Sequence, residues 1–273
     1  MAKFNAVPHA SYLFAPPVVE FDRHIVERHV PKMLEHYHQC LKRHLKPLAF
    51  AMNVLGLSRD TINASKIGFV DRSLPLQFPY HKTVEGRKLR GALIRLRFLA
   101  GTGHEIMRGC LTLPLFSEDN QVGMCGLRYD RPRRDKVSFK CTTFCDLPIF
   151  GPSLSGSVAM LCNTPFTVLA LAERGYKNGF AVLGTDVTAF TLAELVKKGV
   201  TSVVVFTDAT SDETETTELR TTLRAFGLTL CEVPLPFVVE NLGKWEEYQW
   251  QLFDKRLTRV LKEKGLRNER YQA

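Results

Sequence analysis

Four acidic residues in the last third of the chain are suited to holding a divalent cation. Asp186 and Asp208 each follow a short apolar run that predicts a strand, and Asp212 and Glu213 come soon after Asp208. Loops and helix N-termini converge at the carboxyl ends of strands in an open α/β sheet, and carboxylate oxygens are the ligands that Mg²⁺ and Mn²⁺ prefer. The pattern predicts Asp208, Asp186 and Asp212 as catalytic residues and Asp208, Asp212 and Glu213 as metal ligands. The alternative is that Asp212 and Glu213 stabilise a helix N-terminus without any metal.

Basic residues are concentrated in the first part of the chain. Residues 1–157 contain 23 Lys plus Arg against 13 Asp plus Glu, a net charge of +10, whereas residues 158–273 have a net charge of −1. A concentrated positive field binds phosphate backbones with strong salt dependence. The predicted nucleic-acid contacts are Arg95, Arg97, Arg128, Arg131, Arg133, Arg134, Lys136 and Lys140, with Phe139 as a stacking face. The alternative is a surface whose arginines only keep the protein soluble.

The seven cysteines show no paired short spacing of the kind that builds a zinc ribbon. Reduced and mostly buried thiols are therefore expected. Structural zinc is the alternative, because Cys141 and Cys145 are four residues apart and His36, His38 and Cys40 crowd one short segment. Packed cysteines beside a solvated histidine face would produce the same pattern.

The bulk composition is that of a folded protein outside the membrane. Hydrophobic residues make up 45% of the 273 residues, and no run approaches the roughly 18 consecutive apolar residues of a membrane helix. The first residues lack the basic and then apolar segments of a signal peptide. A cytoplasmic protein with no membrane partner is expected.

The first half of the chain predicts an α+β region. Residues 1–20 form an arm with little periodicity, and residues 21–55 have the apolar spacing of two helices that break near Pro47. A short helix follows Ser58. Strands are expected at residues 67–70, 93–99, 110–116 and 122–129, the last two joined by a hairpin turn.

Beyond about residue 151 the pattern changes to alternating strands and helices. Strands are predicted at residues 158–162, 180–183, 203–206 and 228–233, and helices at residues 164–174, 188–198 and 212–226. Such alternation with short loops predicts a mostly parallel sheet covered on both faces. Residues 244–264 predict a final amphipathic helix with an aromatic side.

The segment from Val158 to Pro236 resembles the toprim domain of bacterial-type primases, topoisomerases and related nucleases. The resemblance rests on strand and helix order and on two runs, residues 171–176 (LAERGY) and 181–185 (AVLGT). The preceding part resembles the basic subdomain of bacterial-type DNA primases, through residues 55–57 (LGL), 67–69 (IGF) and 113–116 (LPLF). The resemblance covers about residues 35–236 and is strongest to the primase-like proteins of mobile elements.

The resemblance implies a fold and a division into domains. The fold class is α/β, a toprim-like Rossmannoid sheet preceded by a basic α+β primase-type subdomain. The implied domains are an N-terminal arm (1–20), the basic subdomain (21–157), the toprim-like domain (158–240) and a C-terminal helix with its tail (241–273).

The resemblance also implies a chemistry, the synthesis of short RNA primers on single-stranded DNA with Mg²⁺ or Mn²⁺. The family's metal site has a Glu just after the first strand and an Asp-x-Asp after the third. This chain has Cys162-Asn163 at the first place and Asp208-Ala209-Thr210 at the second. Two of the three expected carboxylates are replaced, and loss of such ligands lowers catalysis by orders of magnitude.

Three functions remain open on the sequence alone. The leading hypothesis is a primase-like protein of DNA replication that binds single-stranded DNA or RNA and carries a degenerate toprim site. The first alternative is an active metal-dependent primase or nuclease that uses the relocated acidic cluster. The second is a scaffold that recruits a helicase, polymerase or replication initiator through Trp245, Tyr248 and Trp250. A zinc module, which helps the family select priming sites, would have to come from a partner or the arm.

Overall fold

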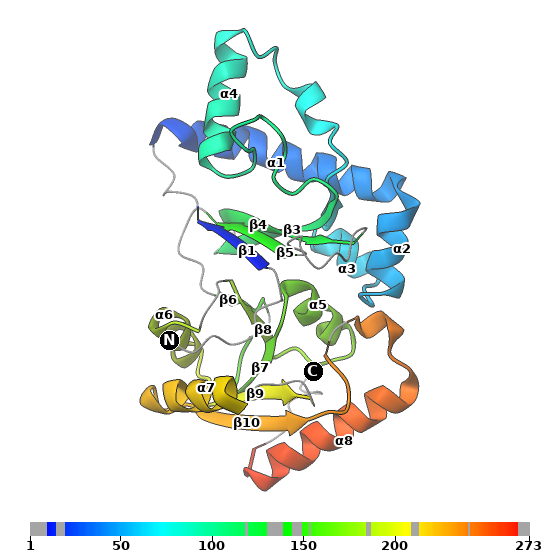
Figure 1. Cartoon of the computed structure of the whole chain (residues 1–273), viewed down its shortest axis with the longest axis vertical. Coiled ribbons are helices and arrows are strands. Elements are labelled where there is room, and N and C mark those ends of the chain that lie inside the picture. The colour runs from blue at the N-terminus through cyan, green and yellow to red at the C-terminus, as the bar shows by residue number, and fades with distance from the viewer. Residues whose placement is uncertain are drawn as a thin grey trace. The chain divides into compact units, whose positions relative to one another are not determined.

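The computed structural model describes residues 10–14, 20–117, 120–129, 139–143, 149–152, 154–183, 187–208, 213–239 and 241–266. The chain divides into two compact units (Figure 1). The N-terminal unit consists of Pro8–Ala51 and Arg59–Leu147. The C-terminal unit consists of Met1–Val7, Met52–Ser58 and Pro148–Ala273.

The N-terminal unit is built on a five-stranded sheet with the order β1-β5-β4-β3-β2. The strands are β1 (Ala10–Phe14), β2 (Gly68–Phe69), β3 (Cys110–Ser117), β4 (Asn120–Arg128) and β5 (Phe139–Thr143). β1 pairs parallel with β5 and the other pairs are antiparallel. The predicted hairpin is confirmed, because Ser117 pairs with Asn120 at the end of the β3–β4 ladder.

Helices cover one face of this sheet. They are α1 (Glu20–Arg43), α2 (Leu45–Asn53), α3 (Arg59–Ala64), the 3₁₀ helix η1 (Leu74–Gln77) and α4 (Val84–Arg95). A core cluster joins Met33 and Tyr37 of α1 with Leu89 and Leu93 of α4 and with Met124 of β4. The predicted break between two helices occurs at His44, three residues before Pro47. Pro47 lies in the first turn of α2, where its missing N–H costs no helical hydrogen bond.

The strand predicted at residues 93–99 is wrong, because α4 runs from Val84 to Arg95. Alternating apolar and cationic residues suggested a strand, but Leu89 and Leu93 lie one helical turn apart and are both buried. The Thr83 side chain caps the helix by accepting a hydrogen bond from the Gly86 N–H at 3.0 Å. The cap that marks the start of this helix, Thr83, therefore lies ten residues before the first residue of the predicted strand.

The C-terminal unit is built on a second five-stranded sheet with the order β10-β9-β7-β8-β6. The strands are β6 (Ile149–Phe150), β7 (Val158–Cys162), β8 (Gly179–Val182), β9 (Ser202–Thr207) and β10 (Thr229–Pro234). β6 pairs antiparallel with β8, and all the other pairs are parallel. The helices are α5 (Pro165–Glu173), α6 (Ala189–Lys197), α7 (Glu213–Ala225), the 3₁₀ helix η2 (Leu242–Lys244) and α8 (Glu247–Glu263).

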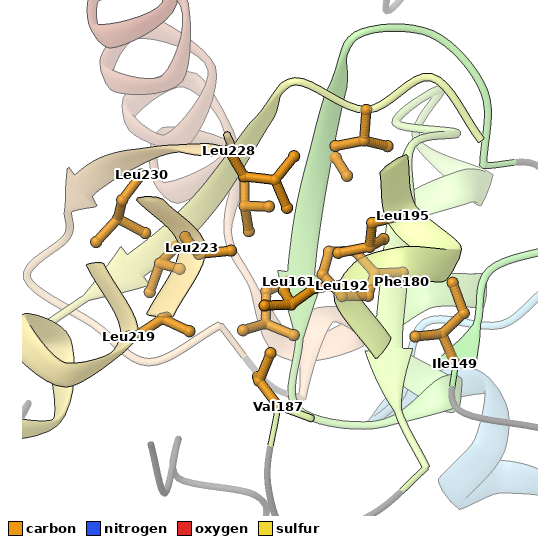
Figure 2. Close-up of a cluster of buried hydrophobic side chains, with 14 of the residues drawn as sticks. Ile149, Leu161, Phe180, Val187, Leu192, Leu195, Leu219, Leu223, Leu228 and Leu230 are labelled. Carbon is orange, nitrogen blue, oxygen red and sulfur yellow. The ribbon is translucent and has the colours of Figure 1, made fainter. Parts of the chain in front are cut away.

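Helices cover both faces of this sheet, as the alternating pattern predicts (Figure 1). On one face, Leu161 of β7 and Phe180 of β8 belong to a core cluster with Leu192 of α6 and Leu219 of α7 (Figure 2). On the other face, Phe206 of β9 lies against Phe253 of α8, with ring centroids 5.0 Å apart. Successive strand residues point to opposite faces, which explains why β7 is buried along its whole length.

A short segment of the first half, Met52–Ser58, belongs to the C-terminal unit. The Gly243 N–H donates a hydrogen bond to the Val54 carbonyl at 3.0 Å. A Cβ on Gly243 would lie 2.6 Å from the Gly56 backbone nitrogen, so the two chain segments can approach this closely only with glycine.

The described residues bear on the state of the cysteines and on the presence of membrane-spanning helices. The six cysteines described are all free and buried, as predicted. None of the described helices combines the length and the apolar character that crossing a membrane requires.

Candidate functional site

Asp208 lies at the carboxyl edge of the C-terminal sheet. β7 and β9 are parallel neighbours whose register pairs Met160 with Val204, so both strands end at the same edge. Asp208 directly follows β9 there and is partly exposed. This is the edge at which open α/β sheets bind ligands.

The residue that ends β7 cannot replace the expected carboxylate. Cys162 is only 4% exposed, and its Sγ lies 3.5 Å from the position that a Cβ on Gly179 would take. The thiol donates to the Met160 carbonyl, and burial raises the pKa of Cys162 to about 12. A neutral thiol turned into the core is not a ligand for a hard cation such as Mg²⁺.

Asn163 is the only residue between β7 and the cap of the next helix. The Thr164 side chain accepts a hydrogen bond from the Thr167 N–H at 3.2 Å, and Pro165 begins α5. Asn163 is partly exposed, but an amide is a poorer Mg²⁺ ligand than a carboxylate. Of the three carboxylate positions that the resemblance implies, Asp208 is the one that holds an acid, so these positions do not fit a three-carboxylate site.

The relocated acidic cluster stays a prediction. Glu213 is exposed in the first turn of α7, where a negative charge is favoured by the helix dipole. Asp186 and Asp212 lie outside the described residues.

Three basic side chains gather on the N-terminal sheet. Lys140 of β5 pairs with Gly126 of β4, and Arg128 of β4 pairs with Cys110 of β3. The pKa of Lys140 is lowered, mainly by burial of its ammonium and further by the positive charges of Arg128 and Arg108. We call Arg108, Arg128 and Lys140 the basic patch.

The loop before β3 holds Arg108 in the basic patch. A Cβ on Gly126 would lie 2.9 Å from the Met107 Sδ, so the missing side chain lets Met107 pack on the sheet. The Lys140 Nζ donates a hydrogen bond to the Ile106 carbonyl at 2.8 Å. Sequence reasoning missed Arg108, because nothing in its neighbourhood shows that the loop folds back onto β4 and β5.

Two of the other predicted nucleic-acid contacts lie among the described residues. Arg95 and Arg97 are exposed at the end of α4, where Arg97 has a φ of 60°. Arg131, Arg133, Arg134 and Lys136 lie outside the described residues.

The prediction that Phe139 offers a stacking face is wrong, because its side chain is only 1% exposed. The side chains of Phe139 and Lys140 point to opposite faces of β5. A base cannot stack on a ring that water does not reach.

A buried acid holds the loop of the basic patch against α1. The Tyr37 hydroxyl donates a hydrogen bond of 2.7 Å to the Glu105 Oε1, and both side chains are buried. Burial raises the pKa of Glu105 above its ordinary value of 4.5, the hydrogen bond from Tyr37 opposes this shift, and the charge of Asp71 adds to it. The stability that this pair contributes therefore depends on pH.

We expect the contribution of Glu105 to the free energy of unfolding to fall as the pH rises above the ordinary pKa of a glutamate. A carboxyl whose pKa is higher in the folded state binds more protons there, so its contribution is present at low pH and is lost as the pH rises through the folded pKa. Urea unfolding of the wild type and of Glu105→Gln across the acid range measures this. The glutamine keeps an acceptor for Tyr37, and an equal pH slope in both proteins would contradict the prediction.

No protein-family model matches the sequence, and a search of curated proteins finds no match. Solved structures match in fold. The DnaG primase catalytic domain bound to ssDNA is 18% identical, with a TM-score of 0.63 over 89% of this chain and 85% of that chain. Aquifex aeolicus primase, solved with its zinc-binding and RNA polymerase domains, is 16% identical, with a TM-score of 0.68 over 90% of this chain and 62% of that chain. The RNA polymerase domain of Mycobacterium tuberculosis DnaG in complex with double-stranded DNA is 15% identical, with a TM-score of 0.65 over 86% of this chain and 80% of that chain.

At these identities the likeness establishes the fold. The chain has the fold of the DnaG primase catalytic core, with a first sheet that is mainly antiparallel and a second that is mostly parallel. The fold class that the resemblance implies is therefore confirmed.

Proposed function

We propose that this protein binds single-stranded DNA or RNA in DNA replication on a primase core that has lost toprim catalysis. The observation that carries the proposal is the buried, neutral thiol of Cys162 at the end of β7, where the family has a metal-binding Glu. A site with one of its three carboxylates is poorly suited to position and neutralise a transferring phosphate. In this proposal the protein keeps nucleic-acid binding but no longer catalyses phosphoryl transfer.

The basic patch supports the nucleic-acid part of the proposal. Arg108 is exposed and Arg128 and Lys140 are half-buried, so their charges are accessible yet held in place. Positively charged grooves bind single strands mainly through the phosphate backbone. The structures of DnaG proteins bound to single-stranded and double-stranded DNA show that this fold can accommodate nucleic acid in those proteins. The origin in a mobile element and the recruitment of replication proteins belong to the same proposal.

Binding to a fluorescent oligonucleotide at several salt concentrations tests the proposal. Three phosphate contacts predict that log K falls with log salt with a slope of about −2, at about 0.7 per contact for a single strand. Double-stranded DNA of the same length and an RNA oligonucleotide identify the preferred form. Absence of salt-sensitive binding to either single strand would contradict the proposal.

The same preparation tests for lost catalysis. With Mg²⁺ or Mn²⁺ and nucleotides we expect no primer product on single-stranded DNA and no strand cleavage, and we expect Asp208→Ala to bind as tightly as the wild type. Metal-dependent product that Asp208→Ala abolishes would replace the proposal with the active enzyme that uses Asp186, Asp208 and Asp212.

A further inference from the structure

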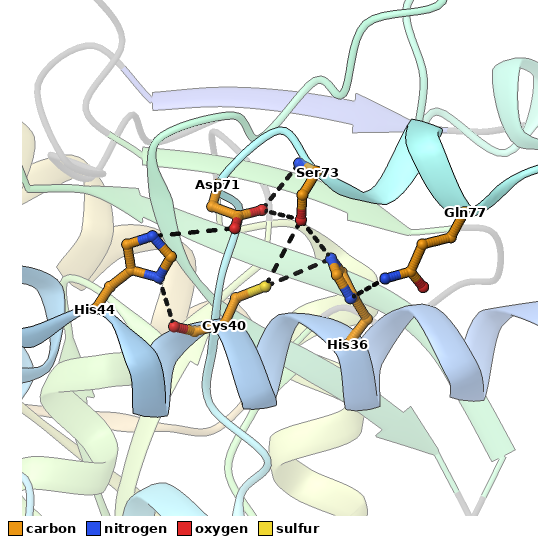
Figure 3. A network of polar contacts seen from close by, with 6 residues as sticks. All are labelled: His36, Cys40, His44, Asp71, Ser73 and Gln77. Atoms are coloured by element: carbon orange, nitrogen blue, oxygen red, sulfur yellow. Dashed lines mark hydrogen bonds and ion pairs between the residues drawn. The ribbon is translucent and has the colours of Figure 1, made fainter.

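Three side chains with nitrogen, sulfur and oxygen donors meet in the N-terminal unit. His36 and Cys40 are four residues apart on α1 and lie on the same face of the helix, and Asp71 follows β2. One potential ligand atom from each residue lies within 4.8 Å of the other two. Figure 3 shows the three side chains pointing toward one another.

The distances suit a tetrahedral cation. The His36 Nε2 lies 3.4 Å from the Cys40 Sγ. Zinc bonds of about 2.3 Å to sulfur and about 2.0–2.1 Å to nitrogen place two tetrahedral ligands about 3.5 Å apart. The His36 and Cys40 donor atoms therefore already stand at the separation that such an ion requires, and an oxygen of Asp71 lies within 4.8 Å of both.

The surroundings orient each donor. Ser73 donates to the Asp71 Oδ1 through both its hydroxyl, at 2.6 Å, and its backbone N–H, at 2.9 Å. The Gln77 amide lies 2.9 Å from the His36 Nδ1. The His36 Nε2 lies 2.9 Å from the Ser73 Oγ, and because that hydroxyl donates to Asp71, Nε2 donates to Ser73 in the metal-free chain. A bound ion would replace this proton, and Gln77 with its amide oxygen turned toward the ring would then accept the proton on Nδ1. Metal-binding histidines generally donate their second ring N–H in this way.

A second histidine lies beside the cluster. The His44 Nδ1 lies 2.7 Å from the Cys40 backbone carbonyl, and the His44 Nε2 lies 4.0 Å from the Asp71 Oδ2. The first contact fixes the proton on Nδ1, so His44 turns Nε2 toward the acid. At 4.0 Å this second contact is longer than a hydrogen bond, so Ser73 is the residue that orients Asp71.

We propose that His36, Cys40 and Asp71 form a binding site for Zn²⁺ or a similar transition-metal ion. Thiolate and imidazole donors favour zinc over Mg²⁺, which takes oxygen ligands. The three side chains leave a fourth tetrahedral position for water or another ligand. The site belongs to the N-terminal unit and is independent of Asp208, so its test stands apart from the proposed function.

Titration of the purified, metal-free full-length chain with Co²⁺, followed by displacement with Zn²⁺, tests this site. We expect a thiolate-to-cobalt charge-transfer band that saturates at one ion per chain, disappears with Zn²⁺ and persists in excess Mg²⁺. Cys40→Ser is expected to abolish the band. Gln77→Ala is expected to weaken Zn²⁺ binding by about 10-fold to 100-fold, the usual effect of losing a residue that orients a ligand.

Control variants separate metal binding from a purely structural hydrogen-bond network. Gln39→Ala removes a partly exposed amide from the same helix, where it donates to Glu35, and is expected to leave Zn²⁺ affinity unchanged. If Cys40→Ser does not fold, as judged by circular dichroism, the Zn²⁺ affinities of His36→Gln and Gln77→Ala test the proposal instead. No charge-transfer band in the wild type, or an equal band in Cys40→Ser, would overturn the proposal, as would Zn²⁺ affinity that neither His36→Gln nor Gln77→Ala changes.

Discussion

Replacing Phe253 with alanine should lower the free energy of unfolding by about 3–5 kcal/mol, the cost of emptying a well-packed aromatic site. Phe253 is 0% exposed. Its ring centroid lies 5.0 Å from that of Phe206 on β9 and 5.1 Å from that of Tyr176. Aromatic pairs at these distances add to the stabilisation from buried area alone.

Tyr248 provides the matched control for Phe253→Ala. It lies on the same helix but is 60% exposed, so Tyr248→Ala should change the free energy of unfolding by less than about 0.5 kcal/mol. Urea unfolding of both variants and the wild type measures the two effects. Equal stability of the two variants would contradict the packing of α8 on its own sheet.

The same packing bears on the scaffold hypothesis. That hypothesis relies on Trp245, Tyr248 and Trp250, but Trp250 is buried and its ring lies 4.7 Å from that of Trp245. The Arg174 guanidinium lies over the Trp250 ring at 4.7 Å, and the Tyr176 hydroxyl donates to Asp254. Most of the aromatic side of α8 therefore packs within its own unit. Of these three aromatic residues, Tyr248 is the one that offers a largely exposed ring.

The C-terminal unit could be predicted from the sequence because its local signals agree. Thr164 with Pro165 marks the start of α5, and Thr188 forms a capping box with Thr191 at the start of α6. Between the helices, the strands are continuous apolar runs, which fits burial on both faces. Local preference and tertiary packing point to the same elements there.

The N-terminal unit was harder to predict because one of its segments fits both a strand pattern and a helix pattern. Residues 93–99 alternate apolar and cationic residues as a strand does, yet Leu93 also completes the buried stripe of a helix that starts at Val84. Tertiary packing decides such cases, since α4 must cover the same core as α1. The local signal that favours the helix, the Thr83 cap, lies ten residues before this segment.

The candidate sites depend on contacts between distant parts of the sequence. The replacement of a carboxylate by Cys162 was visible in the sequence, but the direction of its thiol follows from the close packing at Gly179. The sequence suggested zinc ligands His36, His38 and Cys40, whereas His38 is buried against the Ile67 carbonyl and Asp71 takes its place. Helical spacing explains the difference, because residues 36 and 40 share a face and residue 38 does not.

The double variant Arg108→Ala/Arg128→Ala should weaken binding to single-stranded DNA about 25-fold at 0.1 M salt, about fivefold for each lost phosphate contact. The slope of log K against log salt should become shallower by about 1.4 for the same reason. The charges of both arginines contribute to the lowered pKa of Lys140, so their removal should also relieve that part of the lowering, while the larger part is due to burial of the ammonium. Fluorescence anisotropy over a salt series measures the affinity and the slope together.

The double variant Arg224→Ala/Arg259→Ala changes the net charge by the same amount and provides the control. Arg224 is exposed in the last turn of α7, and Arg259 is paired with Glu263 at 2.8 Å in α8. If binding depends on the basic patch, this control should bind within about twofold of the wild type at 0.1 M salt, since it leaves all three charges of the patch in place. Equal losses in the two double variants would mean that net charge, and not the placement of Arg108 and Arg128 beside Lys140, governs binding.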